Sequence, residues 1–145
     1  MSTGYDRPGA AARMGTAVIR TLAEAGISVA GTRAIAVRGR TSGTLRRAVV
    51  NILTVDDVSY LVAPRGNTEW VRNVRAAGEI QVGPRWRARR VSATEVLDDD
   101  KPELLRRYLQ RWYWQVKDHV AGLTPQSSDQ DLRLAAPAIP VFSLR

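Results

Sequence analysis

Residues 34–63 read AIAVRGRTSGTLRRAVVNILTVDDVSYLVA, and this stretch decides the fold. Three of its segments are rich in Val, Ile and Leu and are separated by turn residues: 34–38, 47–55 and 58–63. The pair Asp56-Asp57 predicts a tight hairpin between the second and third segments, because Asp tolerates the backbone of a two-residue turn. Residues 39–44 predict a longer, basic loop between the first two. The stretch therefore predicts three consecutive antiparallel strands.

Helical and strand patterns continue on both sides of this stretch. Residues 100–103, DKPE, are similar to a capping box and predict the start of a helix that reaches about His119. In residues 86–97 the small and apolar positions change phase, which predicts one long strand with a bulge near Arg89-Arg90. Residues 122–131 have the composition of a loop. The other expected elements are helices over 8–25 and 68–77 and strands over 79–82 and 139–144.

These elements predict an α+β fold. About six mostly antiparallel strands, joined by hairpins rather than by βαβ units, are typical of a small barrel, here with three to four flanking helices. The length of 145 residues fits one domain, residues 1–145. Within it we expect an N-terminal helical segment at 1–26 and the barrel at 34–145.

The composition excludes several kinds of site and segment. The chain has no cysteine and a single histidine, so disulfides, thiolate chemistry and cysteine or multi-histidine metal sites are excluded, and no metal is expected. Its longest uncharged stretch, residues 134–144, contains two prolines and is too short for a membrane span. No secretory signal is readable at residues 1–8, so we expect a cytoplasmic protein. Membrane contact through the helix at 8–25 is not favoured, because its polar face has few cations.

Arginine dominates the charge. Lys and Arg number 22 against 14 acids, a net charge of +8, and only two of these cations are lysines. Residues 33–55 hold five arginines and no acid, and Arg85, Arg87, Arg89 and Arg90 form a second cluster. The planar guanidinium binds phosphate and carboxylate through two hydrogen bonds, so this pattern suits an anionic small ligand or nucleic acid equally well. A GC-rich genome would also enrich arginine without any ligand.

Two segments are candidates for binding an anion. Residues 38–47, RGRTSGTLRR, combine glycines, hydroxyls and guanidiniums in one loop, without the pattern of a Walker or dinucleotide motif. Residues 63–75, APRGNTEWVRNVR, lead from a loop into a helix that Thr68 is expected to cap. The alternatives are a solvated turn for the first segment and a packing helix with Trp70 in the core for the second.

Together the two segments resemble a known family. Residues 39–46, GRTSGTLR, and 64–78, PRGNTEWVRNVRAAG, are similar to the Gly-Arg-x-Ser-Gly-x-x-Arg loop and the Trp-x-x-Asn-Leu-Arg-Ala helix of the deazaflavin-dependent nitroreductases. Residues 139–142 are similar to the last strand of that family. The resemblance implies a split β-barrel like that of FMN-binding proteins. It also implies that reduced coenzyme F420 passes a hydride to a small electrophile, such as a nitroaromatic, a quinone or an activated enone.

The resemblance also implies which residues bind F420. The loop residues would hold its phosphate and acidic tail, the residues after the third strand would follow its ring and ribityl chain, and the helix would complete the wall. These cofactor-binding residues are Arg40, Thr41, Ser42, Arg46, Arg47, Ala48, Val62, Ala63, Pro64, Arg65, Glu69, Trp70, Val71, Arg72 and Asn73. The chain departs from the family at Thr41, where Lys is frequent, and at residues 66–68.

Candidates for the substrate side come from the later helix. Tyr113 or His119 would act as the catalytic proton donor. Tyr108, Trp112 and Trp114 are further candidates for lining a substrate pocket, although the helical spacing of Tyr108 and Trp112 favours the core. The family's tyrosines before the last strand are missing from residues 125–145, so the acceptor stays open.

Alternative functions come from the same features. An FMN-binding split barrel is the nearest alternative, and a carrier without catalytic activity is another. A basic nucleic-acid-binding barrel would use the positive charge, but stacking aromatics are not interleaved with the basic loops. We expect a small-molecule electron acceptor as the partner, and the oligomeric state is open.

Overall fold

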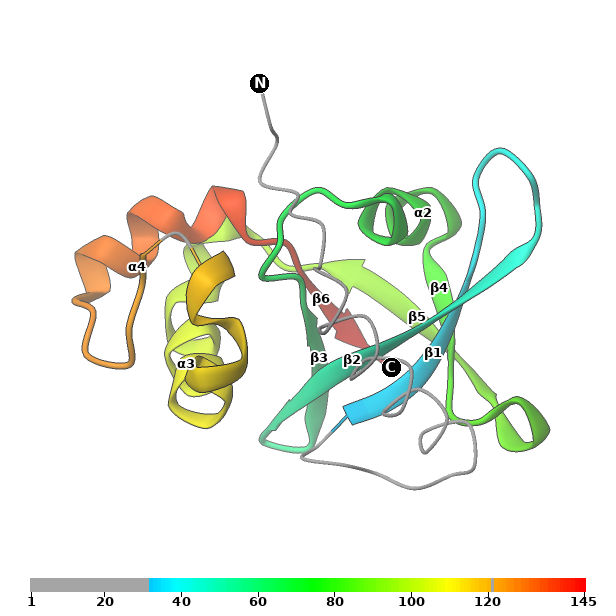
Figure 1. Ribbon diagram of the computed structural model, residues 1–145, viewed down its shortest axis with the longest axis horizontal. Helices are drawn as coiled ribbons and strands as arrows, with labels where there is room; N and C mark the ends of the chain where they lie inside the picture. Colours follow the sequence, from blue (N-terminus) through cyan, green and yellow to red (C-terminus); the bar gives the residue numbers. More distant parts are fainter. Residues whose placement is uncertain (1–31, 121) are drawn as a thin grey trace.

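Antiparallel strands close into a barrel within residues 32–120 and 122–145, the part of the chain that this computed structural model describes (Figure 1). The strands follow one another around the ring in the order β1-β2-β3-β6-β5-β4, and β4 pairs with β1 to close it. Their bounds are β1 Thr32–Arg38, β2 Leu45–Val55, β3 Val58–Val62, β4 Glu79–Val82, β5 Arg89–Glu95 and β6 Val141–Leu144. This confirms the predicted α+β split β-barrel of six mostly antiparallel strands.

The two hairpins expected from residues 34–63 are both present. Strand β1 pairs with β2 from Thr32↔Asn51 to Arg38↔Leu45, so residues 39–44 form the basic loop. Strand β2 pairs with β3 up to Val55↔Val58, which leaves a two-residue turn at Asp56 and Asp57. Both aspartates have a positive φ, 51° and 66°, as a type I′ turn requires.

Strand β3 separates two hydrophobic clusters, because alternate side chains on a strand point to opposite faces. Leu61 points into the barrel, where it packs with Ile35, Ile80 and Phe142. Val62 points outward and belongs to a second cluster with residues of the later helices, among them Leu105. Strand β3 therefore contributes both to the barrel interior and to the outer helical layer.

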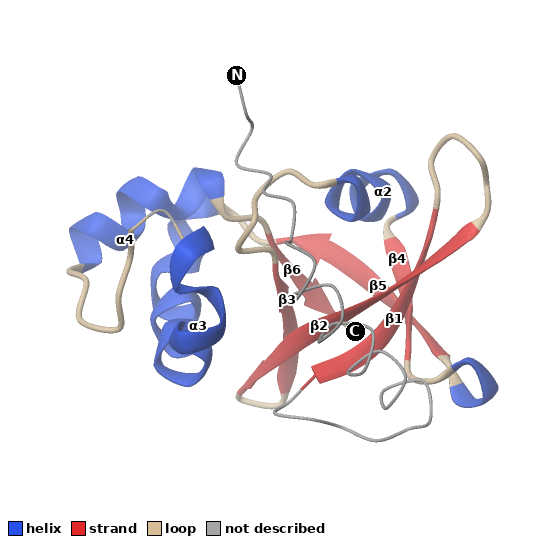
Figure 2. Ribbon diagram, in the orientation of Figure 1, coloured by secondary structure: helices blue, strands red, loops and turns tan. Residues whose placement is uncertain are grey.

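Helices cover two regions of the barrel (Figure 2). Helix α2, Glu69–Ala77, lies over one end, and α3, Lys101–Val116, and α4, Asp129–Ala135, pack beside β2 and β3. Short 3-10 turns precede α3 at Asp98–Asp100 and follow α3 and α4 at Lys117–His119 and Ala136–Ala138, and another lies between β4 and β5 at Arg85–Arg87. No helix in the described ranges is long and apolar enough to cross a lipid bilayer.

Three local predictions are wrong. The expected strand over 86–97 begins only at Arg89, because Arg85–Arg87 form a 3-10 turn. Its pairing with β4 is continuous, so there is no bulge at Arg89-Arg90 and the change of phase marks the end of the turn. Helix α4 lies within the expected loop 122–131 and beyond it, and Ser128 caps it by accepting a hydrogen bond from the N–H of Asp131 at 3.1 Å.

The start of α3 is placed as predicted, but its chemistry differs from a capping box. Asp100 occupies the N-cap position without a capping hydrogen bond from its side chain. Instead, the buried Lys101 donates to the carbonyl of Ala136 at 2.9 Å and pairs with Asp98 at 2.7 Å. The predicted helix at 8–25 lies outside the described residues, and the single-domain boundaries stay a prediction.

Candidate active site

The basic loop and helix α2 enclose a polar pocket. Hydrogen bonds from Gly39 N–H to Thr44 O at 2.8 Å and from Gly43 N–H to Gly39 O at 2.9 Å hold the loop between β1 and β2. A Cβ at Gly39 would lie 2.7 Å from Ser42 Oγ and 3.6 Å from Arg46 Nε, so only glycine lets these side chains close over the loop. The pocket has a volume of about 410 Å³ and is lined by Gly39, Arg40, Thr41, Ser42, Arg46, Glu69 and Asn73.

Arg40 ties this loop to helix α2. Its Nη1 donates to Glu69 Oε2 at 2.7 Å and to Asn73 Oδ1 at 2.8 Å, and its backbone N–H donates to the same oxygen of Asn73 at 3.1 Å. Asn73 is buried, so its amide is a fixed acceptor for the loop. Two motifs from separate parts of the sequence are thereby joined at one point.

Positive charge controls the ionisation of Glu69. The hydrogen bond and charge of Arg40 hold the pKa of Glu69 below its ordinary value, with smaller contributions from Arg72 and Arg46. Because Glu69 is exposed, the ion pair is screened by water and contributes little to the stability of the fold. Its carboxylate nevertheless occupies the same pocket as the arginines.

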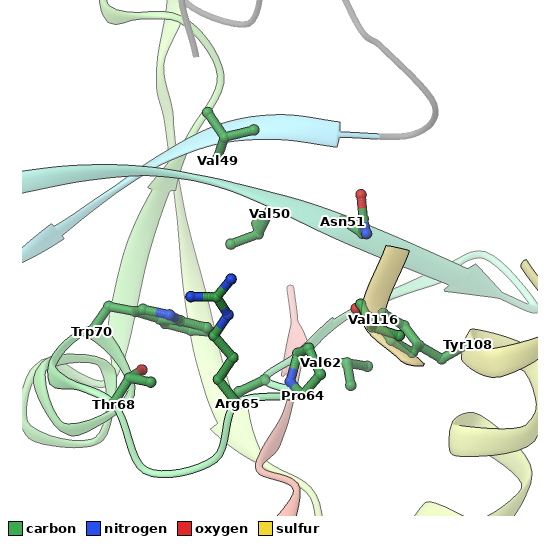
Figure 3. A pocket seen from close by; sticks show the side chains of 11 residues that line it. Val49, Val50, Asn51, Val62, Pro64, Arg65, Thr68, Trp70, Tyr108 and Val116 are labelled. Carbon is green, nitrogen blue, oxygen red and sulfur yellow. The ribbon is translucent and has the colours of Figure 1, made fainter. Parts of the chain in front are cut away.

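A second pocket is mainly apolar and opens beside the first turn of α2 (Figure 3). It has a volume of about 270 Å³. The side chain of Arg65 extends from the loop after β3 toward Val50 on β2, and Trp70 points into the same space from α2. The lining residues are Val49, Val50, Asn51, Val62, Ala63, Pro64, Arg65, Thr68, Trp70, Tyr108 and Val116.

Three polar groups besides Arg65 lie in this apolar wall. Asn51 donates through Nδ2 to Gln115 Oε1 at 3.2 Å, while its buried Oδ1 has no hydrogen-bond partner among the described residues. The hydroxyl of Thr68 is likewise buried without a partner there, and it does not cap α2 as predicted. Burial raises the pKa of Tyr108 to about 12, against the smaller effect of a hydrogen bond with Asn51. Each of these groups is available to a bound molecule.

Most of the predicted cofactor residues line one of the two pockets. The polar pocket contains Arg40, Thr41, Ser42, Arg46, Glu69 and Asn73, and the apolar pocket contains Val62, Ala63, Pro64, Arg65 and Trp70. The other four lie elsewhere. Val71 is buried in the barrel core, Ala48 packs against that core, Arg72 is exposed, and Arg47 is half-buried on β2.

The predicted proton donors are Tyr113 and His119. Tyr113 is not among the residues that line these two pockets; it packs against the outer cluster, with its ring 5.7 Å from that of Trp114. His119 ends the 3-10 turn after α3, and its side chain lies outside the described part of the structure. Both assignments stay predictions. Tyr108, for which the sequence favours the core, is buried in the outer cluster and also lines the apolar pocket.

The sequence reasoning missed four pocket residues. Val49, Val50 and Asn51 lie on β2, and Val116 ends helix α3. The one available signal was Asn51, a single amide in an otherwise apolar strand segment. The residues on β2 that line the pocket depend on how α3 packs against the barrel, which no local pattern indicates.

The two pockets fit the parts of a deazaflavin coenzyme. They meet at the first turn of α2, where Glu69 lines the polar pocket and Thr68 and Trp70 line the apolar one. A phosphate and acidic tail matches the arginine pocket in charge, and a ring with polar edges matches apolar walls that contain unpartnered oxygens.

Comparisons with known proteins agree on the fold. Protein Atu2129 from Agrobacterium tumefaciens, of unknown function, is 22% identical with a TM-score of 0.53, over 79% of this chain and 47% of that protein's length. An F420-H2 dependent reductase, FDR-A, is 16% identical with a TM-score of 0.56, over 79% of this chain and 94% of its own. General Stress Protein 26 from Bacillus anthracis is 12% identical with a TM-score of 0.52, and 88% of each chain is covered.

Sequence comparison identifies the family. A search among curated proteins finds no match. The model of the F420H2-dependent quinone reductase family matches residues 12–122, which is more than half of the chain and includes both pocket motifs. The chain therefore belongs to the F420H2-dependent quinone reductase family, and it is an oxidoreductase whose cofactor is coenzyme F420.

Proposed function

We propose that this protein reduces a small quinone-like acceptor with F420H2, and that the two pockets at the first turn of α2 form its active site. The observation that supports this most directly is the junction itself. An arginine-lined pocket and an apolar pocket share one helical turn, and this matches a cofactor with an anionic tail and a flat ring. Nitroaromatics and activated enones belong to the same class of electrophilic acceptor. The family name makes a quinone the first to test.

The arginines bind the tail. Arg46 and Arg40 offer guanidiniums to its phosphate, and Thr41 and Ser42 add hydroxyl donors. Arg40 is held by Asn73 at 2.8 Å, so its position is fixed before the cofactor binds. Of the remaining predicted residues, Arg47 and Arg72 add positive charge near this end, whereas Ala48 and Val71 support it from the core.

The apolar pocket orients the ring and excludes water. Val62, Ala63 and Pro64 form one side, and Trp70 and Arg65 another. When bound, F420H2 supplies the hydride, and the protein contributes orientation and a dry environment. Thr68 and Asn51 offer their unpartnered oxygens to N–H or O–H groups of the bound molecules.

Reduction of a quinone adds a proton as well as a hydride. Tyr108 lines the apolar pocket, and its hydroxyl stays protonated in the physiological range because its ordinary pKa is already about 10 and burial raises it to about 12. We assign it the role of a hydrogen-bond donor to the acceptor oxygen, beside Asn51. Tyr113 and His119 are the alternative proton donors. We also propose that the reaction takes place in the cytoplasm.

The test compares Arg46→Ala with Arg133→Ala, an exposed arginine on α4. Loss of one charge-assisted hydrogen bond to the tail lowers the affinity for F420 about 10- to 100-fold, while circular dichroism stays unchanged. The control variant retains the affinity of the parent. Equal affinity in both variants would remove the loop from the site. Micromolar FMN binding without any response to F420 would favour the FMN alternative.

A further inference from the structure

The turn that joins β4 to β5 carries a cluster which the active site does not use. Residues 83–90, GPRWRARR, form what we name the arginine-tryptophan tip. Trp86 is 66% exposed there, the largest exposure among the described tryptophans after Trp114. Arg85, Arg87 and Arg89 are exposed around it. The tip therefore presents an aromatic ring together with several positive charges.

The tip has a defined backbone shape. Arg87 N–H donates to Pro84 O at 2.9 Å and closes the 3-10 turn. Gly83 has a φ of 111°, and a Cβ there would lie 3.1 Å from the carbonyl oxygen of Arg87. The guanidinium of Arg87 stacks over the ring of Trp86, 4.7 Å from its centroid. These contacts hold the indole on the surface.

Most of the positive charge of the tip has no acidic partner among the residues that the structure describes. Residues 80–94 contain no Asp or Glu. Glu79 pairs with Arg90 at 3.2 Å, whereas Arg85, Arg87 and Arg89 have no acidic partner within the described ranges. Three guanidiniums are therefore available to an external anion.

The tip lies away from the active site. Helix α2 ends at Ala77, and strand β4 leads from there to the tip, so α2 and the tip lie at opposite ends of β4. In Figure 1 the tip is the small green turn that projects at the lower right, far from α2 and from the layer of α3 and α4. A partner bound there would leave the pockets open.

We propose that the arginine-tryptophan tip docks the protein peripherally on an anionic lipid surface. Tryptophan is enriched at the boundary between headgroups and acyl chains, where its ring is half apolar and half polar. Arginines beside it gain from the negative potential of the membrane, about fivefold in affinity per residue. A single-stranded nucleic acid fits less well, because it needs several aromatic rings along a groove and the tip has one.

Binding to vesicles tests the proposal independently of hydride transfer. The full chain is sedimented with vesicles in which phosphatidylcholine is mixed with the anionic lipid phosphatidylserine, and with vesicles of phosphatidylcholine alone. The test variant is Arg85→Gln/Arg87→Gln. The matched control is Arg111→Gln/Arg133→Gln, which removes the same charge from the helical layer. F420 affinity is measured for each, because the tip lies outside the pockets and all variants are expected to retain it.

We expect binding to the anionic vesicles, weakened about 30-fold in the tip variant and by much less in the control. Trp86→Ala should also weaken binding and abolish the blue shift of tryptophan emission on mixing. Equal binding to both kinds of vesicle would overturn the proposal, as would equal losses in the two double variants. Release of the protein from vesicles by a short single-stranded DNA would assign the tip to nucleic acid instead. A tip variant that lost F420 affinity would contradict the separation of the two sites.

Discussion

Glu69 places a carboxylate in a pocket that otherwise collects arginines. It accepts a hydrogen bond from Arg40 at 2.7 Å, so Arg40 is occupied before any ligand arrives. An anion that binds Arg40 must compete with this internal carboxylate. Glu69 is therefore expected to lower the affinity of the pocket for anions and to restrict it to ligands that make several contacts.

The variant Glu69→Gln should bind sulfate severalfold more tightly than the parent. In the parent, Arg40 holds the pKa of Glu69 below its ordinary value, so the carboxylate is charged at neutral pH and is neutralised only in acid. Sulfate affinity should rise in the parent as the pH falls through this lowered pKa, whereas the variant should change little. An NMR titration of the loop amides from pH 7 downward measures both.

Glu79→Gln is the matched control, because Glu79 on β4 pairs with Arg90 on β5 and neither residue lines the polar pocket. It should leave sulfate binding in the polar pocket unchanged. If Glu69→Gln bound sulfate no better than this control, the carboxylate would not compete for Arg40.

Tyr108 should make the protein sensitive to alkali. Its pKa is about 12 in the folded protein and about 10 when unfolded. The folded state therefore favours the protonated form, and this contribution is complete below pH 10 and is lost as the pH rises toward 12. By pH 11 the loss in unfolding free energy is about 1 kcal/mol.

Urea unfolding at pH 9 and pH 11 checks this for the parent and for Tyr108→Phe. The variant lacks the ionisable hydroxyl and should lose less stability between the two pH values. An equal loss in both proteins would show that other groups cause the alkaline sensitivity.

At the scale of single residues, the sequence predicted the polar pocket better than the apolar one. Arg40, Ser42 and Asn73 belong to short motifs, and local loop and helix geometry brings them into one pocket. Asn51 and Tyr108 line the same pocket only because α3 packs against β2. Packing between elements so far apart in the sequence leaves no periodic signal in β2 or in α3.

Among the elements, the β2–β3 turn depends on two aspartates with positive φ, 51° at Asp56 and 66° at Asp57. Glycine is favoured at the second position of such a turn. We expect Asp57→Gly to stabilise the fold by about 0.5 kcal/mol, because it relieves the steric cost of the left-handed backbone.

The opposite change at the end of α2 provides the comparison. Gly78 has a φ of 71°, and a Cβ there would meet no atom within 4 Å, so only backbone strain opposes alanine. Gly78→Ala should cost about 1–2 kcal/mol. Urea unfolding of both variants gives the two signs, and a stabilising Gly78→Ala would contradict the conformational explanation.

Helix α4 and strand β5 show where pattern reading fails for whole elements. The segment before α4 is rich in Ser, Asp and Gln, which favours a loop, yet Ser128 and the acidic first turn are ordinary signals for a helix start. Before β5, the alternating pattern that begins at residue 86 favours a strand, although Gly83 and Pro84 indicate a turn. In both segments, the capping or turn residue indicates the local structure better than the composition does.

On the scale of the whole molecule, the barrel core and the outer helical layer should unfold together. Strand β6 contributes Val141 to the outer cluster and Phe142 to the barrel core. Phe142→Ala should lower the unfolding free energy by about 3–5 kcal/mol. Leu134→Ala is the control, because Leu134 is 73% exposed and its loss should change stability by about 0.5 kcal/mol or less.

Circular dichroism and tryptophan fluorescence should report the same urea midpoint in the parent and in both variants. Tryptophan fluorescence follows the surroundings of Trp112 in the outer cluster and of Trp70 beside the barrel core, whereas circular dichroism follows the secondary structure of the whole chain. Separate midpoints would mean that the layers unfold independently and that β6 does not couple them.

The number of strands and their hairpin order were predictable because those contacts are local. Closure of the ring was predicted only as part of the fold class. The pairing of β1 with β4 consists of Ile35↔Val82 and Ala36↔Gln81, and β3 pairs with β6, which comes from the far end of the sequence. Neither pairing has a turn signal in the sequence, so their register could come only from the structure.

The late position of β6 affects how the chain is made. Ribosomes add about 5–20 residues per second, so β3 emerges several seconds before the strand that fills the space beside it. During that interval the nascent β1–β2–β3 sheet presents an unpaired apolar edge, which is a template for aggregation. Production of this protein should therefore depend on chaperones that bind extended segments, even though the finished ring has no free edge to offer them.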